Sequence, residues 1–269
     1  MTKLLRPTTI VSLLVVLLCL VMAFAPQLIA PGDPLAGTPR DRLLPPSAEH
    51  LFGTDSLGRD VFTRVVHGAW LSLAAATAAV LIGGVVGGAI GLLCGAARGR
   101  VGTAIDFVVM RFVDVLIAVP GILLALIVVA TLGFGPWSIA LGVGLGAAGS
   151  FARIMRAQVL RVRGEEYVEA AAVLGVRPLG VLGRHILPNA ARPVLAMAAL
   201  ELGTAVLSVS AISFLGFGVA PPAPEWGALV SSGRDYIATS WWLTVLPGAV
   251  IVGVVLAVTR LARVIGEAR

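Results

Sequence analysis

The sequence is first informative through what it almost lacks. Only 13% of its 269 residues are charged, against about 25% in soluble globular domains. Lysine occurs once, as Lys3, which excludes a Walker A loop because that loop ends in Gly-Lys-Ser/Thr. The chain therefore cannot bind and hydrolyse ATP by that route, and we predict that it is not an enzyme.

Cysteine and histidine are equally scarce. The two cysteines, Cys19 and Cys94, lie inside apolar runs, where cysteine usually behaves as a small buried hydrophobic residue. We expect neither a disulfide nor a metal site there. The three histidines are not spaced with cysteines or carboxylates as zinc ligands would be, and no Gly-x-Ser-x-Gly motif is present.

What the sequence has in excess is apolar surface. Apolar residues make up 58% of the chain and the mean hydropathy is +0.99, which is more than one soluble core can bury. The apolar runs are continuous and do not alternate with polar residues as barrel strands do. We predict an all-α polytopic membrane protein with six transmembrane helices at 9–30, 70–96, 104–132, 136–155, 193–217 and 241–262.

Charge between the apolar runs predicts the orientation. The net charge of +6 is explained by the positive-inside rule rather than by nucleic-acid binding, because the arginines gather in the segments that are cytoplasmic when the N-terminus is inside. Residues 156–192 hold the largest group. The first apolar run resembles a signal peptide, but its length favours an uncleaved anchor. Both termini are predicted to be cytoplasmic.

The chain divides into three parts by composition. Residues 1–69 combine an N-terminal anchor, a proline-rich extracytoplasmic loop and, from about Ser56, an amphipathic helix that Thr54 or Asp55 would cap. Residues 70–262 form the core of membrane spans with its cytoplasmic loop at 156–192, and 263–269 form a short cytoplasmic tail. The amphipathic helix either seals the bundle or contacts an extracytoplasmic partner. The predicted partner contacts are Asp55, Arg59, Asp60, Glu225 and Trp226.

Small residues and charges inside the spans give two further predictions. Gly83, Gly87, Gly91 and Gly95 recur every fourth residue, which allows close helix packing within the chain or at a subunit interface. Charged residues in a span are functional candidates because lipid disfavours them. Arg111 and Asp114, three apart, would partly satisfy each other, either to fix packing or to line an aqueous path, and Glu201, which has no obvious partner, would also line an aqueous path.

The stretch GEEYVEAAAVLG at Gly164–Gly175 places a charged helix between two apolar runs. Acidic residues in its first turn complement the helix dipole. Tyr167, Ala170 or Ala171, and Leu174 are predicted to form one face. Gly175 would stop the helix, Pro178 would begin a second short one that runs to Leu187-Pro188, and the pair would dock in a groove of a partner.

These motifs together resemble a known family. EAAAVLG (Glu169–Gly175) with ILP (Ile186–Pro188) is similar to the EAA loop of binding-protein-dependent ABC importer permeases. FGTDSLGRDV, MRFVDVLIAVP and SFLGFGVAPPAPEWG follow the C-type subunit of the dipeptide/oligopeptide/nickel branch over roughly residues 50–250. The tail TRLARVIGEAR departs from that pattern, because it lacks a longer polar ending.

The resemblance implies a type I importer fold in a bacterial cytoplasmic membrane. The partners would be a second homologous permease, two cytoplasmic ATPases that bind ATP and Mg, and an extracytoplasmic binding protein that delivers peptides. No cofactor, metal or nucleic acid is expected on this chain. Nickel chelates, glutathione or haem are the alternative cargo, and an ion-coupled transporter or a structural scaffold are the rival classes. The ATPase-coupling residues would be Glu165, Glu166, Tyr167, Glu169, Ala170, Ala171, Leu174, Gly175, Leu187 and Pro188.

Overall fold

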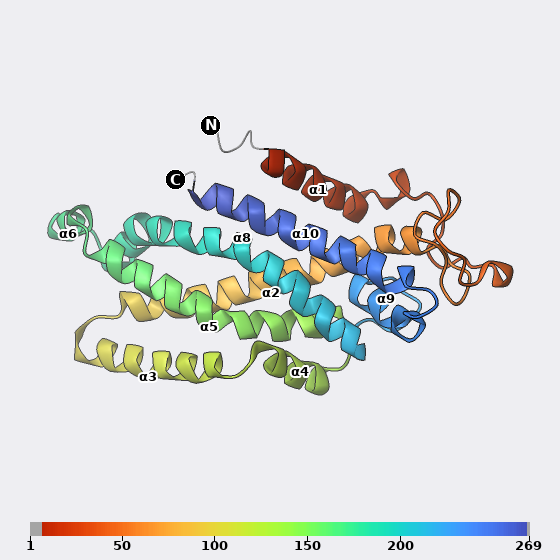
Figure 1. Cartoon of the computed structure of the whole chain (residues 1–269). Helices are drawn as coiled ribbons and strands as arrows, with labels where there is room; N and C mark the ends of the chain where they lie inside the picture. The colour runs from red at the N-terminus through yellow and green to blue at the C-terminus, as the bar shows by residue number, and fades with distance from the viewer. Residues whose placement is uncertain (1–6, 268–269) are drawn as a thin grey trace.

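A computed structural model describes residues 7–267 of the chain, and all regular structure in this part is helical. Long helices lie side by side, with α6, the start of α1 and the end of α10 toward one end of the bundle and α9 and the loop after α1 at the other (Figure 1). The helices are α1 Pro7–Phe24, α2 Val61–Ala96, α3 Gly99–Ala118, α4 Gly121–Leu132, α5 Pro136–Arg163, α6 Glu166–Val173, α7 Pro178–Val181, α8 Leu187–Ile212, α9 Trp226–Gly233 and α10 Trp242–Glu267.

Membrane-spanning length is confirmed for most of the predicted segments. Five helical stretches of the described chain are long and apolar enough to cross a bilayer, and α3 with α4 adds a sixth if this bent pair counts as one span. The predicted continuous helix over 104–132 is wrong, because α3 and α4 meet at 92°. Pro120 cannot donate the next helical hydrogen bond, and Val119 before it is extended (φ −79°, ψ 127°).

Two other helices are longer than predicted. Helix α5 was predicted to end at residue 155 but continues to Arg163. Its last two turns still pack against α2 through Val159. The stretch from Pro178 is helical up to a kink at Gly216 (φ +93°), and a π-helical segment at Leu182–Ile186 leads into α8. The predicted second short helix is therefore the first turns of a long span.

The glycine row of α2 packs against α5 within this chain, as the intramolecular alternative predicted. A Cβ on Gly83 would lie 2.8 Å from the carbonyl oxygen of Gly144, and one on Gly95 would lie 2.7 Å from the Cβ of Val159. The four glycines lie in turn against the backbone carbonyls of Gly144, Ala148, Ala152 and Arg156. Both series advance by four residues at each step, so α2 and α5 run parallel in a fixed register.

The predicted amphipathic helix from Ser56 is wrong. Gly58 has φ +75°, which ends any helix there, and the Asp55 carboxylate accepts from the backbone N–H of Leu57 (2.8 Å) and of Arg59 (3.0 Å) in a turn. Helix α2 begins instead at Val61, where Asp60 is the N-cap and accepts from the N–H of Thr63 (2.7 Å). The apolar stripe belongs to the first turns of a span.

Candidate functional sites

Helix α6 is the element that the sequence marked for coupling, and its end is formed as predicted. Gly175 has φ +82°, a conformation that favours glycine, and there the backbone N–H of Val176 donates to the carbonyl of Ala171 (3.1 Å). The chain then turns and Pro178 starts the next helix. The predicted stop at Gly175 and restart at Pro178 are confirmed.

The two faces of α6 differ from the predicted pattern in one respect. Val168 is 2% exposed and Ala171 is 8% exposed, so these two side chains anchor α6 to the bundle. Ala171 was predicted for the docking face and points inward instead. Exposed to solvent are Tyr167, Ala170, Leu174, Glu165, Glu166, Glu169, Gly175, Leu187 and Pro188.

Large apolar side chains surround this outward face without covering one another. Val173, Leu174 and Leu179 are 87%, 84% and 82% exposed. Such exposure at the end of the bundle is typical of an interaction surface. Val173 was not among the predicted residues, although it lies in the motif stretch, and Leu179 was predicted only as part of the second short helix.

A side chain outside the predicted set joins α6 to α8. Asn189 Nδ2 donates to the hydroxyl of Tyr167 (3.1 Å) and to the carbonyl of His185 (2.8 Å). The rings of Tyr167 and His185 are 6.5 Å apart. Both ends of the segment are thereby attached to long helices, α5 directly and α8 through Asn189. Asn189 directly follows the ILP motif at Ile186–Pro188, but sequence alone did not identify it as the link.

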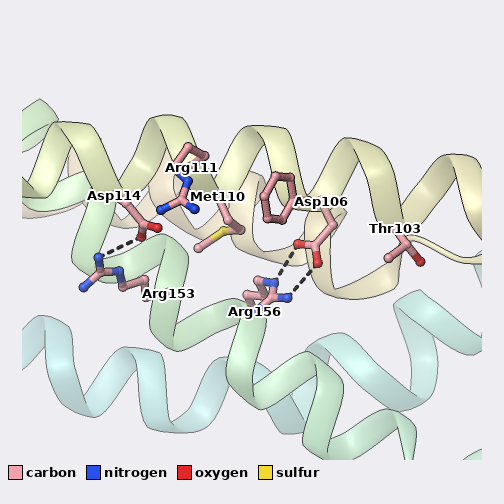
Figure 2. Close-up of a pocket in the computed structure, with 8 residues that line it drawn as sticks. Thr103, Asp106, Met110, Arg111, Asp114, Arg153 and Arg156 are labelled. Atoms are coloured by element: carbon pink, nitrogen blue, oxygen red, sulfur yellow. Dashed lines mark hydrogen bonds and ion pairs between the residues drawn. The ribbon is translucent and has the colours of Figure 1, made fainter.

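A charged seam, which we define as Asp106, Asp114, Arg153 and Arg156, connects α3 to α5 (Figure 2). Arg156 donates from Nε and Nη2 to the two carboxylate oxygens of Asp106, both at 2.6 Å. Arg153 Nη2 donates to Asp114 Oδ1 at 2.8 Å. Val113 is the one buried residue of α3, so these ion pairs supply much of the attachment of α3 to the bundle.

The predicted Arg111–Asp114 pair is wrong, because Asp114 bonds to Arg153 across the helix interface instead. Arg111 lies 5.6 Å from the ring centre of Phe107, at a distance suited to a cation–π contact. Its guanidinium and both ion pairs line a cavity of about 490 Å³ between α3 and α5. Glu201 on α8 is not among the residues that line this cavity, so the three predicted path residues are not brought together.

The opposite end of the bundle holds the residues predicted to contact a partner. Asp55 is 9% exposed and accepts from Arg59 Nε at 2.7 Å, while Asp60 also bonds to His50 Nδ1 (2.9 Å). These three side chains therefore hold the loop together. Their contact with a partner stays a prediction.

Burial contradicts the predicted surface contact for Glu225 and Trp226, which are 1% and 0% exposed. Glu225 caps α9 by accepting from the N–H groups of Gly227 (3.0 Å) and Ala228 (2.9 Å), and it also accepts from Ser72 Oγ (3.0 Å). Trp226 Nε1 donates to the carbonyl of Val65 (2.9 Å). Both side chains fix α9 against α2 because a buried carboxylate and indole need such partners.

The described residues contain no group of three histidine, cysteine or carboxylate side chains that could hold a metal ion. The candidate sites are a helix with an exposed apolar face at one end of the bundle, a charged seam beside a cavity, and a loop held together by side-chain bonds at the other end. On a bundle of apolar spans these features define a polytopic membrane protein with an exposed short helix between two of its spans.

Comparison with known proteins identifies the family. Residues 87–268 match the model described as binding-protein-dependent transport system inner membrane component, and the chain belongs to this family. It is 38% identical over 246 residues to the probable D,D-dipeptide transport system permease protein DdpC of Escherichia coli K12, covering 91% of this chain and 81% of that protein.

Other relatives have the same extent of similarity. The di/tripeptide permease protein DppC of Pseudomonas aeruginosa is 38% identical over 92% of this chain and 82% of its own length. The glutathione permease protein GsiD of Pectobacterium atrosepticum is 37% identical over 91% and 80%. A solved structure of the inward-facing MetNI methionine ABC transporter matches the fold with a TM-score of 0.63, 22% identity, and 77% and 96% coverage. The chain is thus an ABC importer permease subunit.

Proposed function

We propose that this permease carries di- or oligopeptides and that α6 transmits the conformational change of two partner ATPases to the spans. The observation that supports this most strongly is the exposed apolar face of α6, held rigidly by α5 and by the Asn189 bond to Tyr167. A helix fixed at both ends moves with its spans, whereas a flexible loop would absorb the displacement.

Peptide cargo is supported by the relatives, which are named for D,D-dipeptides, di- and tripeptides, and glutathione, itself a peptide. Within the complex, a second homologous permease would complete the path. The ATPases would bind ATP and Mg, and this chain would need no cofactor. An extracytoplasmic binding protein would deliver cargo at the end opposite to α6, at the loop between α1 and α2, which includes Arg59 and Asp60.

We also propose that the cavity beside the charged seam belongs to the translocation path, with Arg111 and Asp114 at its wall and Glu201 on another part of the path. The supporting observation is that the side chains of the Arg153–Asp114 pair, on two apolar helices, are 49% and 42% exposed. Charges in such a place face a wet cavity more readily than lipid.

Leu174→Glu tests the coupling role. Leu174 is 84% exposed, so a glutamate there leaves the fold intact but places a charge in the apolar contact. We expect the permease pair to assemble, the ATPases to be lost on purification, and uptake of a labelled dipeptide into vesicles with ATP to fall at least about tenfold, as for a contact worth about 1.4 kcal/mol or more.

The matched control is Leu28→Glu, because Leu28 is 80% exposed and belongs to the segment after α1, at the end of the bundle opposite to α6. It should keep ATPase binding and uptake at the level of the unmodified complex. If Leu174→Glu retains both ATPases and full dipeptide uptake, α6 is not the coupling element. If coupling holds but nickel or haem is taken up instead of the dipeptide, the cargo proposal fails alone.

A further inference from the structure

The cavity between α3 and α5 has one positive charge that nothing in the described chain balances. Its ionisable lining consists of two carboxylates and three arginines, which gives a formal net charge of +1. The charged seam pairs each carboxylate with one arginine of α5. The third arginine, Arg111, forms no ion pair or hydrogen bond with any residue that the structure describes, so its charge is free for a ligand.

An aromatic ring holds Arg111 in place without using its hydrogen-bond donors. The guanidinium carbon lies 5.6 Å from the centre of the Phe107 ring, about one helical turn earlier on α3, and both residues line the cavity. A cation–π contact acts through the face of the ring, so the N–H groups of the guanidinium stay available. A carboxylate is a suitable acceptor because its two oxygens match the planar fork of an arginine.

A free acceptor lies one helical turn beyond Arg111. Arg153 donates only to Oδ1 of Asp114 (2.8 Å), and this side chain is 42% exposed, so its Oδ2 accepts from no residue of the described chain. Both oxygens of Asp106, by contrast, are occupied by Arg156. Residues three apart share a helix face and are separated by about 4.5 Å along the axis. Figure 2 shows Arg111 and Asp114 extending from α3 toward α5.

A free cation and a free carboxylate oxygen on one face match a ligand that carries one charge of each sign. A peptide with free ends is such a ligand, and the two ends of an extended dipeptide are at most about 7 Å apart. The cavity volume of about 490 Å³ lies within the range of about 300–1,000 Å³ that is usual for small-molecule sites. Phe107 and Met110 line it with apolar surface, and methionine adapts to groups of different shape.

We propose, on the basis of the peptide cargo and the path proposed above, that this cavity is a dipeptide site of the permease itself. Arg111 binds the carboxylate of the cargo and Asp114 binds its ammonium group. These are the groups that all unmodified dipeptides share, while the variable side chains pack against Phe107 and Met110. The site therefore accepts many dipeptide sequences but rejects peptides whose ends are blocked.

The experiment measures binding of radiolabelled alanyl-alanine to the purified complex of permeases and ATPases, without ATP and without the binding protein. Alanyl-alanine amide, which lacks the carboxylate, is the competing probe. In the unmodified complex the amide should bind about 10- to 100-fold more weakly, because a charge-assisted hydrogen bond is lost. Arg111→Gln should weaken alanyl-alanine binding by a similar factor and bind the two probes equally well.

Arg100→Gln is the matched control, because Arg100 is an exposed arginine of the same helix that does not line the cavity. It should keep the preference for the free carboxylate. The other end of the peptide is tested with N-acetyl-alanyl-alanine, which should bind more weakly than alanyl-alanine to the unmodified complex. Asp114→Asn should bind the acetylated and the free peptide equally well, and thermal unfolding of each variant shows that it is folded.

Three outcomes overturn the proposal. They are no binding of alanyl-alanine to the unmodified complex, an unchanged preference for the free carboxylate in Arg111→Gln, and loss of the second permease from Arg111→Gln on purification, which would make Arg111 a subunit contact. Uptake of alanyl-alanine by the unmodified complex, with ATP and the binding protein, separates this result from the proposed function. If uptake occurs, only the dipeptide site is wrong, whereas without uptake the peptide cargo itself is wrong.

Discussion

At the scale of single residues, the two ion pairs between α3 and α5 differ in their access to water. The Arg156–Asp106 pair has side chains 33% and 15% exposed, while those of Arg153–Asp114 are 49% and 42% exposed. Arg156→Ala should therefore lower the free energy of unfolding by about 1–3 kcal/mol, and Arg153→Ala by less than about 1 kcal/mol. Thermal unfolding of both variants in the same detergent measures the difference.

A charge reversal provides the control for this comparison. Asp106→Arg combined with Arg156→Asp restores opposite charges at the same two positions, so it should recover part of the stability that either single change loses. Equal losses of stability for Arg153→Ala and Arg156→Ala would show that the bidentate geometry and lower exposure of the Arg156–Asp106 pair do not matter.

The same seam shows what the sequence could not reveal at this scale. Arg111 and Asp114 are three residues apart, and helix spacing alone makes them partners. The structure gives Asp114 to Arg153, 39 residues away, because α3 faces α5. Local spacing predicts neighbours on one helix, but it contains no information on which helix lies opposite, and the same limit hid Asn189 as the partner of Tyr167.

At the scale of elements, the contact between α2 and α5 depends on the missing side chains of its glycines. A Cβ on Gly87 would collide with the carbonyl of Ala148, which belongs to helix backbone that cannot move alone. Gly87→Ala should therefore lower the free energy of unfolding by about 1–3 kcal/mol through overpacking. Thermal unfolding and the yield of folded protein measure this.

The same substitution at Gly253 on α10 is the matched control. A Cβ there meets no atom within 4 Å, so Gly253→Ala should raise stability by about 0.5–1 kcal/mol through helix propensity. A stabilising effect of Gly87→Ala would mean that α2 and α5 are not in close contact in the membrane.

Prediction of elements succeeded where the signal was local and failed where it was not. Gly175 and Pro178 predicted the end of α6 and the next start because positive φ and a fixed proline φ are properties of the residues themselves. Apolar run length did not predict the 92° bend at Pro120, nor that α2 begins at Val61 as one helix. Gly58 at positive φ, which separates the loop from α2, was the overlooked signal.

At the scale of the whole molecule, α6 and the loop before α2 lie at opposite ends (Figure 1). With α6 inside the cell, Leu51→Cys, on a residue 56% exposed in the outer loop, should react with a membrane-impermeant maleimide on intact spheroplasts. Ala170→Cys, on the exposed face of α6, should react only after permeabilisation. The native cysteines are both buried, which keeps the background low.

A reversed labelling pattern would place the coupling segment outside and remove the proposed ATPase contact. Reaction of both variants on intact cells would mean that the membranes leak. Release of a soluble cytoplasmic marker, measured in parallel with the Ala170→Cys variant, checks this. The polytopic class and the family were already predicted from composition and motif order, because both depend on many residues at once and tolerate errors at any single boundary.

The fixed register between α2 and α5 has a consequence for the direction in which α6 faces. Because α5 is locked in rotation by its contacts with α2 and leads through a two-residue turn into α6, the azimuth of α6 is set by the helical phase of α5. One added residue would turn everything beyond it by about 100°. An insertion near the end of α5 would keep the contacts between α2 and α5 but turn Leu174 away from its partner. The orientation of the docking face therefore depends on the number of residues between the α2 contact and α6.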